Sequence, residues 1–375
     1  MRRRALLAWP LLLALAACGA ALHGPAPSPP PGSTPSAPRG SASGSLARLA
    51  AARQLLWGTA ITLPDLQDPG LRQLIAQQTS AITPENALKW DATEPQPGSF
   101  NLEEGDALVQ FARQQGLAVR GHTLLWHQQL PGWLTALPAP ELRRALERHV
   151  RTLAGHWRGQ IHTWDVINEP IDEQGRGLRR SLWLERLGPG VYADTLRWAH
   201  EADPSARLAI NEYGLEGDDP QTARKREALL TLVRDLRRRG APLQVIGLQA
   251  HLLAPQQGAP QFRTLPAFLE ALRRLGLEVQ ITELDVSDRQ LPADPARRDG
   301  AVAATYGAFL AAVLPEPALR LVGTWGLSDQ RSWLNQAFPR RDGLPQRPLP
   351  YDNTLRPKAA RSSIAAGLMQ QPPSP

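Results

Sequence analysis

Eight short apolar runs alternate with amphipathic helical patterns, and this alternation constrains the fold more than any other feature of the chain. The runs cover residues 55–58, 79–83, 118–122, 162–167, 208–211, 245–250, 279–282 and 321–325. Segments between them, such as 105–116, 225–240 and 265–276, carry apolar residues three and four positions apart and end in a glycine that suits a helix C-cap. Strands that alternate with helices run parallel, and eight of them close most simply into a barrel. The sequence therefore predicts an α/β fold, a (β/α)8 TIM barrel, as a single catalytic domain over residues 46–370.

The first residues have the features of an export signal. Three arginines at 2–4 precede an apolar stretch at 5–17 that is too short to span a bilayer. The following LAAC, residues 15–18, resembles the lipobox of bacterial lipoproteins, in which cleavage before the cysteine leaves a thiol that takes up lipid. We expect residues 1–17 to be a lipoprotein-type signal peptide and Cys18 to anchor the exported protein to a membrane of the cell envelope. Cleavage near Ala20 by an ordinary signal peptidase is the alternative, and the protein would then be secreted.

The segment behind Cys18 is a predicted linker. Residues 18–45 consist largely of Pro, Ser, Gly and Ala, which cannot build a core and favour a semi-extended chain. Cys18 is the only cysteine, so the folded domain must be stable without an intramolecular disulfide. At the other end, we expect residues 371–375 to be a disordered tail.

The charge of the chain does not indicate a nucleic-acid partner. The formal net charge of +7 falls to +4 without the three leader arginines, because residues 1–17 contain no acidic residue. We find no basic stripe interleaved with aromatic residues, and the RKR run at 224–226 is interpreted as a solvated helix face.

Polar and aromatic residues collect directly after the predicted strands. In a parallel barrel the carboxyl ends of all strands meet at one face, where the chemistry takes place. Carboxylates, amides, imidazoles and flat aromatic rings in one place suit the hydroxyls and apolar faces of sugars. The candidates are Glu85, Asn86, Lys89, His122, Trp126, Asn168, Glu169, Tyr213, Gln249, His251, Glu283, Asp285, Trp325 and Trp333.

Two of these candidates, Glu169 in WDVINEP and Glu283 in VQITELDV, each close a predicted buried strand. Two carboxylates at the ends of the fourth and seventh strands are the expected equipment of a retaining glycosidase. Further motifs along the chain point to one family of glycosidases. It resembles glycoside hydrolase family 10, the endo-1,4-β-xylanases, through TPENALKW (83–90), GHTLLWHQQLPGW (121–133), WDVINE, GLEVQITELDV, TWGLSDQRSW (324–333) and PLPYDNTLRPKAA (348–360), which occur in the order and spacing of the family.

The resemblance implies a role for each candidate. Glu169 would be the acid/base and Glu283 the nucleophile that attacks the sugar. The other matched residues would line the sugar subsites nearest the cut. They are Glu85, Asn86, Lys89, His122, Trp126, Asn168, Gln249, His251, Trp325 and Trp333, and we add Tyr213 after the fifth strand.

The two glutamates need opposite environments, because one must be protonated while the other is ionised. Trp164 and Pro170 lie near Glu169 in sequence, and a negative Glu283 would also favour its protonated form. His251 and neighbouring amides would keep Glu283 ionised, and Asp285 on the same side of the strand would orient that histidine. Asn168 would hold the 2-hydroxyl of the cleaved sugar.

Alternative interpretations remain for several residues. His122, His127 and His251 could bind a metal, but no HExxH-type spacing supports this, and we expect neither metal nor cofactor. Trp325 and Trp333 are predicted platforms for sugars, whereas Trp57, Trp183 and Trp198 are predicted core. The expected partners are xylan, xylo-oligosaccharides and, through Cys18, a membrane; we expect a monomer.

Two departures from the family pattern leave other functions open. Pro170 follows Glu169 where a small residue is more usual, and Asn-Glu-Pro also occurs in cellulase-like barrels, so a β-1,4-glucanase of mixed specificity is one alternative. NEYG (211–214) replaces the more usual NDYN, and the asparagine missing at Gly214 puts contacts to the leaving group in doubt. A surface lipoprotein that binds xylan without cutting it is the other alternative, although a binder need not retain both glutamates.

Overall fold

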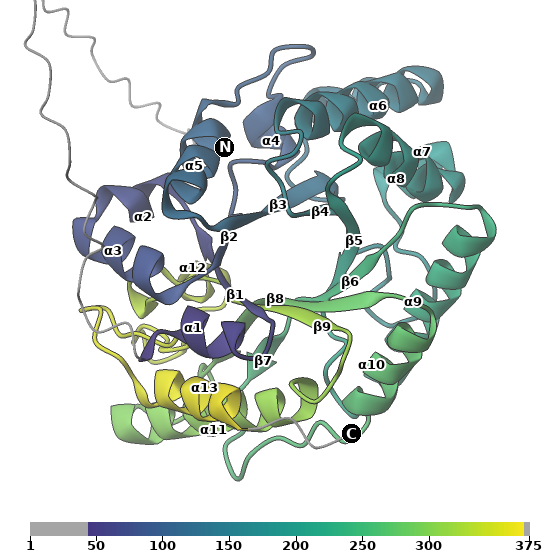
Figure 1. The fold of residues 1–375 in the computed structure, drawn as a ribbon. Coiled ribbons are helices and arrows are strands. Elements are labelled where there is room, and N and C mark those ends of the chain that lie inside the picture. The colour runs from purple at the N-terminus through teal and green to yellow at the C-terminus, as the bar shows by residue number, and fades with distance from the viewer. Residues whose placement is uncertain (1–43, 371–375) are drawn as a thin grey trace, which may run out of the picture. The chain divides into compact units, whose positions relative to one another are not determined.

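Eight parallel strands close into a ring, as the sequence predicts (Figure 1). The computed structural model describes residues 44–370 of the 375. Each strand pairs with its neighbours in chain order, and the ring closes where β1 pairs with β9 and β6 pairs with β8. The barrel strands are β1 (Leu56–Ile61), β2 (Ala81–Pro84), β3 (Ala118–Leu125), β4 (Thr163–Asn168), β5 (Arg207–Glu212), β6 (Val245–Leu248), β8 (Glu278–Ser287) and β9 (Leu319–Thr324).

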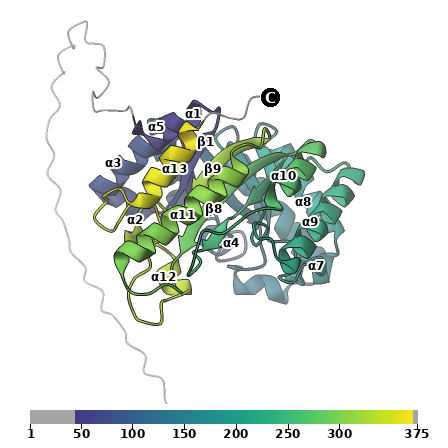
Figure 2. The ribbon, with the colours of Figure 1, turned by 90° about the horizontal axis from the view of Figure 1, so that it is seen from below.

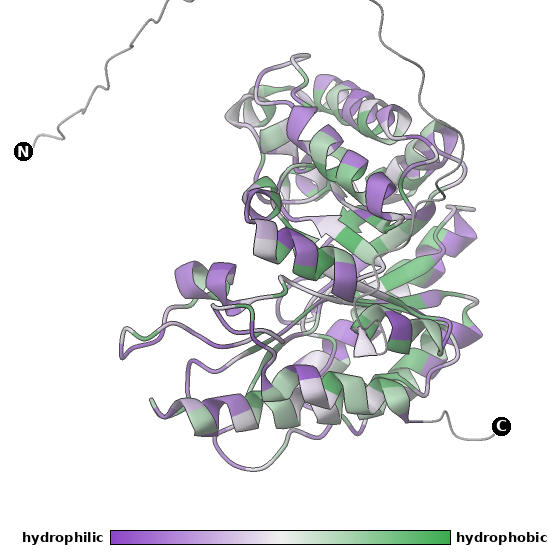
Figure 3. Cartoon of the chain, turned by 60° about the vertical axis from the view of Figure 1, so that its left-hand side comes forward, coloured by the Kyte–Doolittle hydropathy of each residue, from purple (hydrophilic) through white to green (hydrophobic). Residues whose placement is uncertain are grey.

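Long helices cover the outside of the ring (Figure 1). They are α3 (Pro69–Gln78), α5 (Glu103–Gln115), α6 (Ala139–His156), α8 (Gly190–Ala202), α9 (Pro220–Arg238), α10 (Leu265–Arg274), α11 (Pro295–Val313) and α13 (Ala359–Met369). The covering helices carry both hydrophobic and hydrophilic residues along their length (Figure 3), as expected of helices with one face on a sheet. Within residues 44–370, no helix is both long and apolar enough to cross a membrane.

Short elements occupy the connections between strands and helices, and one of them precedes the first strand. They are α1 (Leu46–Ala51), α2 (Leu63–Gln67), α4 (Trp90–Thr93), α7 (Leu182–Leu187), α12 (Leu334–Ala337), and the 3-10 helices η2 (Gly132–Ala136) and η3 (Asp329–Arg331). Several helices begin at sequence signals: Asp68, Asp219 and Asp294 each accept backbone N–H groups of the first turn of a helix that starts with proline.

The first and last helices of the described chain, α1 and α13, pack against each other. Helix α13 lies alongside α11 and contacts α1 (Figure 2). The guanidinium of Arg361 donates to the carbonyl of Gly44, and that of Arg53 donates to the carbonyls of Gln370 and Leu314. Because Leu314 ends α11 just before β9, α1 is held at the amino ends of the strands.

Polar side chains fill the centre of the barrel. The guanidinium of Arg120 in β3 pairs with the carboxylate of Asp165 in β4, and its Nε donates to Gln280 Oε1 of β8 at 3.0 Å. Gln280 Nε2 donates in turn to Thr163 Oγ1 at 3.1 Å. Glycine at 247 leaves room for this network, because a Cβ there would lie 2.9 Å from Arg120 Nη2.

Several details differ from the sequence-based predictions, including the exact bounds of the strands. The strand expected over 245–250 ends at Leu248, since Ala250 adopts a φ of 61° that breaks the strand, and a further short strand, β7 (His251–Leu253), then pairs with β8. Trp325 follows β9 instead of ending it. The RKR run is not a solvated face, because Lys225 and Arg226 are only 2% and 6% exposed.

The tryptophans assigned to the core are buried: Trp57, Trp183 and Trp198. The predicted signal peptide, Cys18 and the tail at 371–375 lie outside the described residues, as does nearly all of the predicted linker.

Candidate active site

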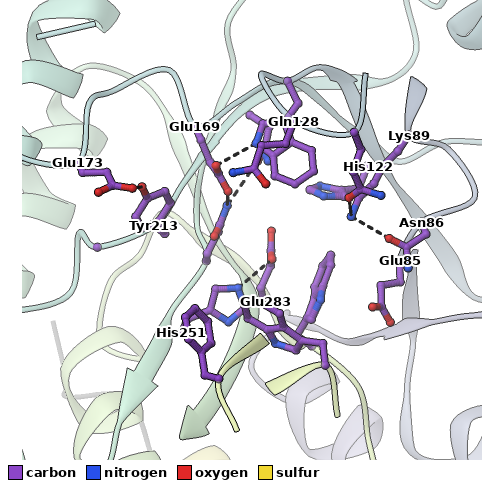
Figure 4. Close-up of a pocket in the computed structure, with 18 residues that line it drawn as sticks. Glu85, Asn86, Lys89, His122, Gln128, Glu169, Glu173, Tyr213, His251 and Glu283 are labelled. Carbon is purple, nitrogen blue, oxygen red and sulfur yellow. Dashed lines mark hydrogen bonds and ion pairs between the residues drawn. The ribbon is translucent and has the colours of Figure 1, made fainter. Parts of the chain in front are cut away.

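The carboxyl ends of the strands surround an open cleft with a volume of about 570 Å³ (Figure 4). The structure places every predicted catalytic and sugar-binding side chain in its wall: Glu85, Asn86, Lys89, His122, Trp126, Asn168, Glu169, Tyr213, Gln249, His251, Glu283, Trp325 and Trp333. Asp285 lies behind this wall and contacts two of its members. The lining also includes residues that the sequence analysis does not select: Gln128, Gln129, Glu173, Gly214 and Phe338.

Glu283 is a buried carboxylate in β8 that is held in its ionised form. Asn211 Nδ2 donates to its Oε1 at 2.7 Å, and His251 Nε2 lies 3.1 Å from its Oε2. Burial acts to raise the pKa of Glu283, but the hydrogen bond from His251, the nearby His122 imidazole and the bond from Asn211 together lower it to about 2. The carboxylate is therefore negative over the whole working range of most enzymes, as a nucleophile must be.

A chain of contacts behind Glu283 fixes its histidine partner. His251 Nδ1 lies 3.0 Å from Asp285 Oδ1, as predicted, and Trp333 Nε1 donates to Asp285 Oδ2 at 2.8 Å. Burial opposes the charged form of His251, yet Asp285 and Glu283 raise the pKa of its imidazole well above the ordinary value. The carboxylate of Asp285 thus orients both the His251 imidazole and the Trp333 indole.

Glu169 follows the last residue of β4 and adopts a φ of 56°. Trp126 Nε1 donates to its Oε2 at 2.9 Å, and Gln249 Nε2 donates to its Oε1 at 3.1 Å. The aromatic neighbour differs from the one expected, because Trp164 is fully buried in the barrel wall, where its ring lies 6.2 Å from that of Trp157. An indole and an amide therefore aim the carboxyl group of Glu169 into the cleft.

The two carboxyl groups belong to one hydrogen-bonded network. Asn211 Nδ2 donates both to Glu283 and to Asn168 Oδ1, the latter at 2.9 Å. Gln249 Nε2, which donates to Glu169, lies 3.5 Å from the same Asn168 oxygen. The positions of the two carboxyl groups are thus coupled through three amide side chains, those of Asn211, Asn168 and Gln249.

Lys89 lies across the cleft from Glu169 (Figure 4). Lys89 is 6% exposed, and its Nζ donates to Asn86 Oδ1 at 2.9 Å and to Gln129 Oε1 at 2.8 Å. Burial lowers the pKa of Lys89, which the charges of Glu283 and Glu85 oppose, and burial raises the pKa of Glu85. Amide, ammonium and carboxyl groups in this arrangement can bind several hydroxyls at once.

His122 is placed from inside the barrel. Its Nδ1 lies 2.9 Å from Asp165 Oδ2, and its ring lies 5.3 Å from that of Trp325.

Within residues 44–370 there is no group of three or more His, Cys, Asp or Glu side chains that could hold a metal ion.

The cleft thus contains two carboxyl groups with different surroundings, together with polar and aromatic side chains. Comparison with known proteins points to the same kind of site. Residues 45–367 match the model of Glycosyl hydrolase family 10. The chain belongs to this family.

Named relatives share most of the length of this family 10 chain. It is 35% identical over 316 residues to endo-1,4-beta-xylanase 2 of Claviceps purpurea, covering 84% of this chain and 87% of the relative. It is also 35% identical over 296 residues to a beta-1,4-xylanase of Dictyoglomus thermophilum, covering 76% and 81%. Among solved structures, xylanase 10B of Thermotoga petrophila RKU-1 in complex with xylobiose has a TM-score of 0.79 at 29% identity, covering 86% of this chain and 97% of that one.

Two supporting residues of this family 10 site are not among the sequence-based candidates. Asn211, the penultimate residue of β5, contacts Glu283, and Asp165 inside β4 contacts His122. Their only sequence signal is a polar residue within an otherwise apolar strand run. A selection restricted to residues that follow the strands misses both.

Proposed function

We propose that this family 10 glycosidase is a retaining endo-1,4-β-xylanase that cuts internal bonds of xylan by double displacement. The observation that carries the proposal is the pair of glutamates in one cleft, one of which, Glu283, is held ionised by His251 and Asn211. Its relatives are named as xylanases, and a xylanase of similar structure has been captured with xylobiose.

The proposed reaction assigns one task to each carboxyl group. Glu169 gives its proton to the glycosidic oxygen while a Glu283 oxygen attacks C1, so that the sugar on the leaving side departs and a glycosyl ester forms. Glu169 then takes a proton from water, the water oxygen attacks C1, and Glu283 is released as a carboxylate. Two inversions at C1 retain the β-configuration. Asn168 lies between the two glutamates, where it can hold the 2-hydroxyl as charge develops at C1.

The assignment of roles is tested by two variants. Glu169→Ala should still cleave aryl xylosides with good leaving groups, and azide should accelerate its turnover and yield a β-xylosyl azide, because no proton is needed for departure. Glu283→Ala should lose activity on every substrate. Equal losses in both variants, without rescue by azide, would contradict the assignment. Proton NMR during early hydrolysis should show the β-anomer first, and a dominant α-anomer would exclude a retaining mechanism.

Release of reducing sugar from xylan and from carboxymethylcellulose tests the substrate. Xylose is glucose without the hydroxymethyl group, and a cleft closed by Trp333 near C5 would reject the larger ring. Comparable rates on the two polymers would favour the mixed-specificity glucanase, and binding of xylan without cleavage would favour a capture protein.

We also propose that the protein is exported and anchored in the cell envelope as a monomer. The support is in the sequence alone: residues 1–17 have the pattern of a lipoprotein signal peptide, Cys18 would carry the lipid, and residues 18–45 would link it to the catalytic domain at 46–370, with 371–375 as a tail. A diacylglyceryl group with a further acyl chain would bury many methylenes at about 0.8 kcal/mol each, enough for stable anchoring.

Fractionation of the native host tests the anchor. The wild-type protein should sediment with membranes, and Cys18→Ala should release an equally active soluble enzyme. A soluble wild-type protein whose mature N-terminus is not a modified Cys18 would contradict the anchor and leave the xylanase proposal intact. Light scattering of a soluble form that starts at residue 44 should give the mass of one chain.

A further inference from the structure

A buried lysine lies behind the cleft wall at Tyr213. Lys225, in α9, is 2% exposed, and its Nζ lies 2.9 Å from Glu212 Oε1 and 3.4 Å from the centre of the Tyr213 ring. A buried ammonium is costly unless it is paired, so these two contacts account for its position. The turn that precedes α7 covers it: a Cβ at Gly175 would lie 2.4 Å from the Lys225 backbone nitrogen.

The partner of this lysine, Glu212, joins the two segments that border the cleft here. Glu212 ends β5 and is fully buried. Its Oε1 accepts the backbone N–H of Tyr213 at 3.1 Å, and its Oε2 accepts that of Ile171, two residues after Glu169, at 2.9 Å. Burial raises the pKa of Glu212 to about 7, and Lys225 acts against that rise. Lys225 therefore favours the charged form of this carboxyl group, which accepts both backbone N–H groups more strongly than a neutral carboxyl group would.

Of the two cations over the Tyr213 ring, Lys225 Nζ is the nearer at 3.4 Å, and the guanidinium of Arg179 lies 5.6 Å from the ring centre. Gly214 lines the cleft with a φ of 66°, and a Cβ placed there would lie 3.7 Å from Lys225 Nζ. From the β4 side, Arg179 Nη2 donates to the Tyr213 hydroxyl at 2.7 Å and Arg179 Nε donates to the Glu169 carbonyl at 2.9 Å. Tyr213 is thus attached to the segment that carries Glu169 by a route separate from Glu212.

The position of Tyr213 indicates which part of the substrate it meets. Tyr213 and Glu173 lie on the Glu169 side of Glu283, whereas Glu85 and Asn86 lie on the opposite side (Figure 4). The acid must stand beside the glycosidic oxygen that it protonates, so the departing sugars extend on the Glu169 side.

We propose that Lys225 is a positioning residue for the leaving-group side of the cleft, where it fixes the Tyr213 ring directly and the backbone beyond Glu169 through Glu212. This inference rests on the proposed glycosidase function. Lys225 does not touch the substrate itself. Its effect is confined to substrates that place sugars against Tyr213 or need the proton of Glu169.

Lys225→Met removes the charge and keeps most of the stem. We expect kcat/KM for xylohexaose to fall by about tenfold or more, because the ring that receives departing sugars is no longer fixed. An aryl β-xylobioside with a good leaving group puts no sugar at Tyr213 and needs no proton, so its kcat/KM should change by less than about twofold. A merely structural lysine would lower both values together.

Two further variants separate positioning from stability. Arg298→Met removes another buried cation, which pairs with Asp288 at 2.7 Å and does not line the cleft; it should lower Tm and leave the ratio of the two kcat/KM values unchanged. Lys225→Met combined with Glu212→Gln leaves no unpaired buried charge and should recover Tm, while the ratio stays shifted because the ring still lacks its ammonium.

Each outcome decides one question. A ratio within twofold of wild type in the folded double variant would overturn the role of Lys225. A wild-type enzyme that is inactive on both substrates would instead overturn the proposed function, since the inference concerns only how activity divides between them.

Discussion

Removal of the charge behind Glu283, the proposed nucleophile, should shift the acidic limb of the pH profile of activity. Asp285 is fully buried and contacts His251 Nδ1 at 3.0 Å, and His251 Nε2 lies 3.1 Å from Glu283. In Asp285→Asn the imidazole loses the carboxylate that favours its charged form. Glu283 then loses a charged hydrogen-bonding partner, and its pKa rises.

The structure sets an upper bound on this effect. The pKa of Glu283 is lowered from 4.5 to about 2, a difference that corresponds to about 3 kcal/mol at ~1.36 kcal/mol per pKa unit. The nucleophile must be ionised, so activity is lost as pH falls through this pKa. If the whole lowering disappeared, the ionised fraction at pH 3 would drop from about 0.9 to about 0.03, which is roughly a 30-fold loss, whereas at pH 6 it would remain above about 0.95 in both proteins.

The assay is kcat/KM for an activated aryl β-xylobioside at pH 3 and pH 6, which depends little on protonation by Glu169. Circular dichroism at both pH values ensures that only folded protein is compared. Glu104→Gln, an exposed carboxylate in α5, is the control and should keep the wild-type profile. An Asp285→Asn profile whose acidic limb coincides with that of the wild type would refute the control of Glu283 through His251.

Three further substitutions test other parts of the site and barrel. Asn211→Ala should reduce kcat/KM on xylan by roughly 10- to 100-fold, since a hydrogen bond to a charged group contributes about 1.5–3 kcal/mol; a loss below threefold would show that the amide is dispensable. Gly121→Ala should lower the free energy of unfolding in urea by about 2 kcal/mol or more, because the new Cβ would lie 2.3 Å from the Trp164 ring; an unchanged urea midpoint would contradict this packing. Trp333→Ala should slow xylan cleavage and narrow the preference for xylan over carboxymethylcellulose by about tenfold, and an unchanged ratio would exclude this wall from substrate selection.

The cleft could be predicted from the sequence because its residues follow strands in a fold where all strands end at one face. Glu85, His122, Glu169, Gln249 and Glu283 are more than a hundred residues apart at the extremes, yet the parallel ring brings them together without any knowledge of register. The family motifs then distinguish these polar residues from ordinary surface ones.

The supporting contacts could not be predicted in the same way. That His122 faces Asp165 depends on the register between β3 and β4, and Asn211 reaches Glu283 only because residue 247 is a glycine with no side chain in the way. Helix periodicity shows which residues share a face of a helix, and it places Lys225 on a face that the sequence predicts to be solvated. It does not show that a loop fifty residues earlier in the chain covers that face.

The packing of the first and last helices, α1 and α13, at one end of the barrel has a consequence for how the enzyme can be attached to other molecules or to surfaces. Both ends of the described chain lie at the amino ends of the strands, and the cleft opens at their carboxyl ends. A fusion partner, a solid support or a tether joined to either end therefore attaches behind the barrel and leaves the front free for a long polymer.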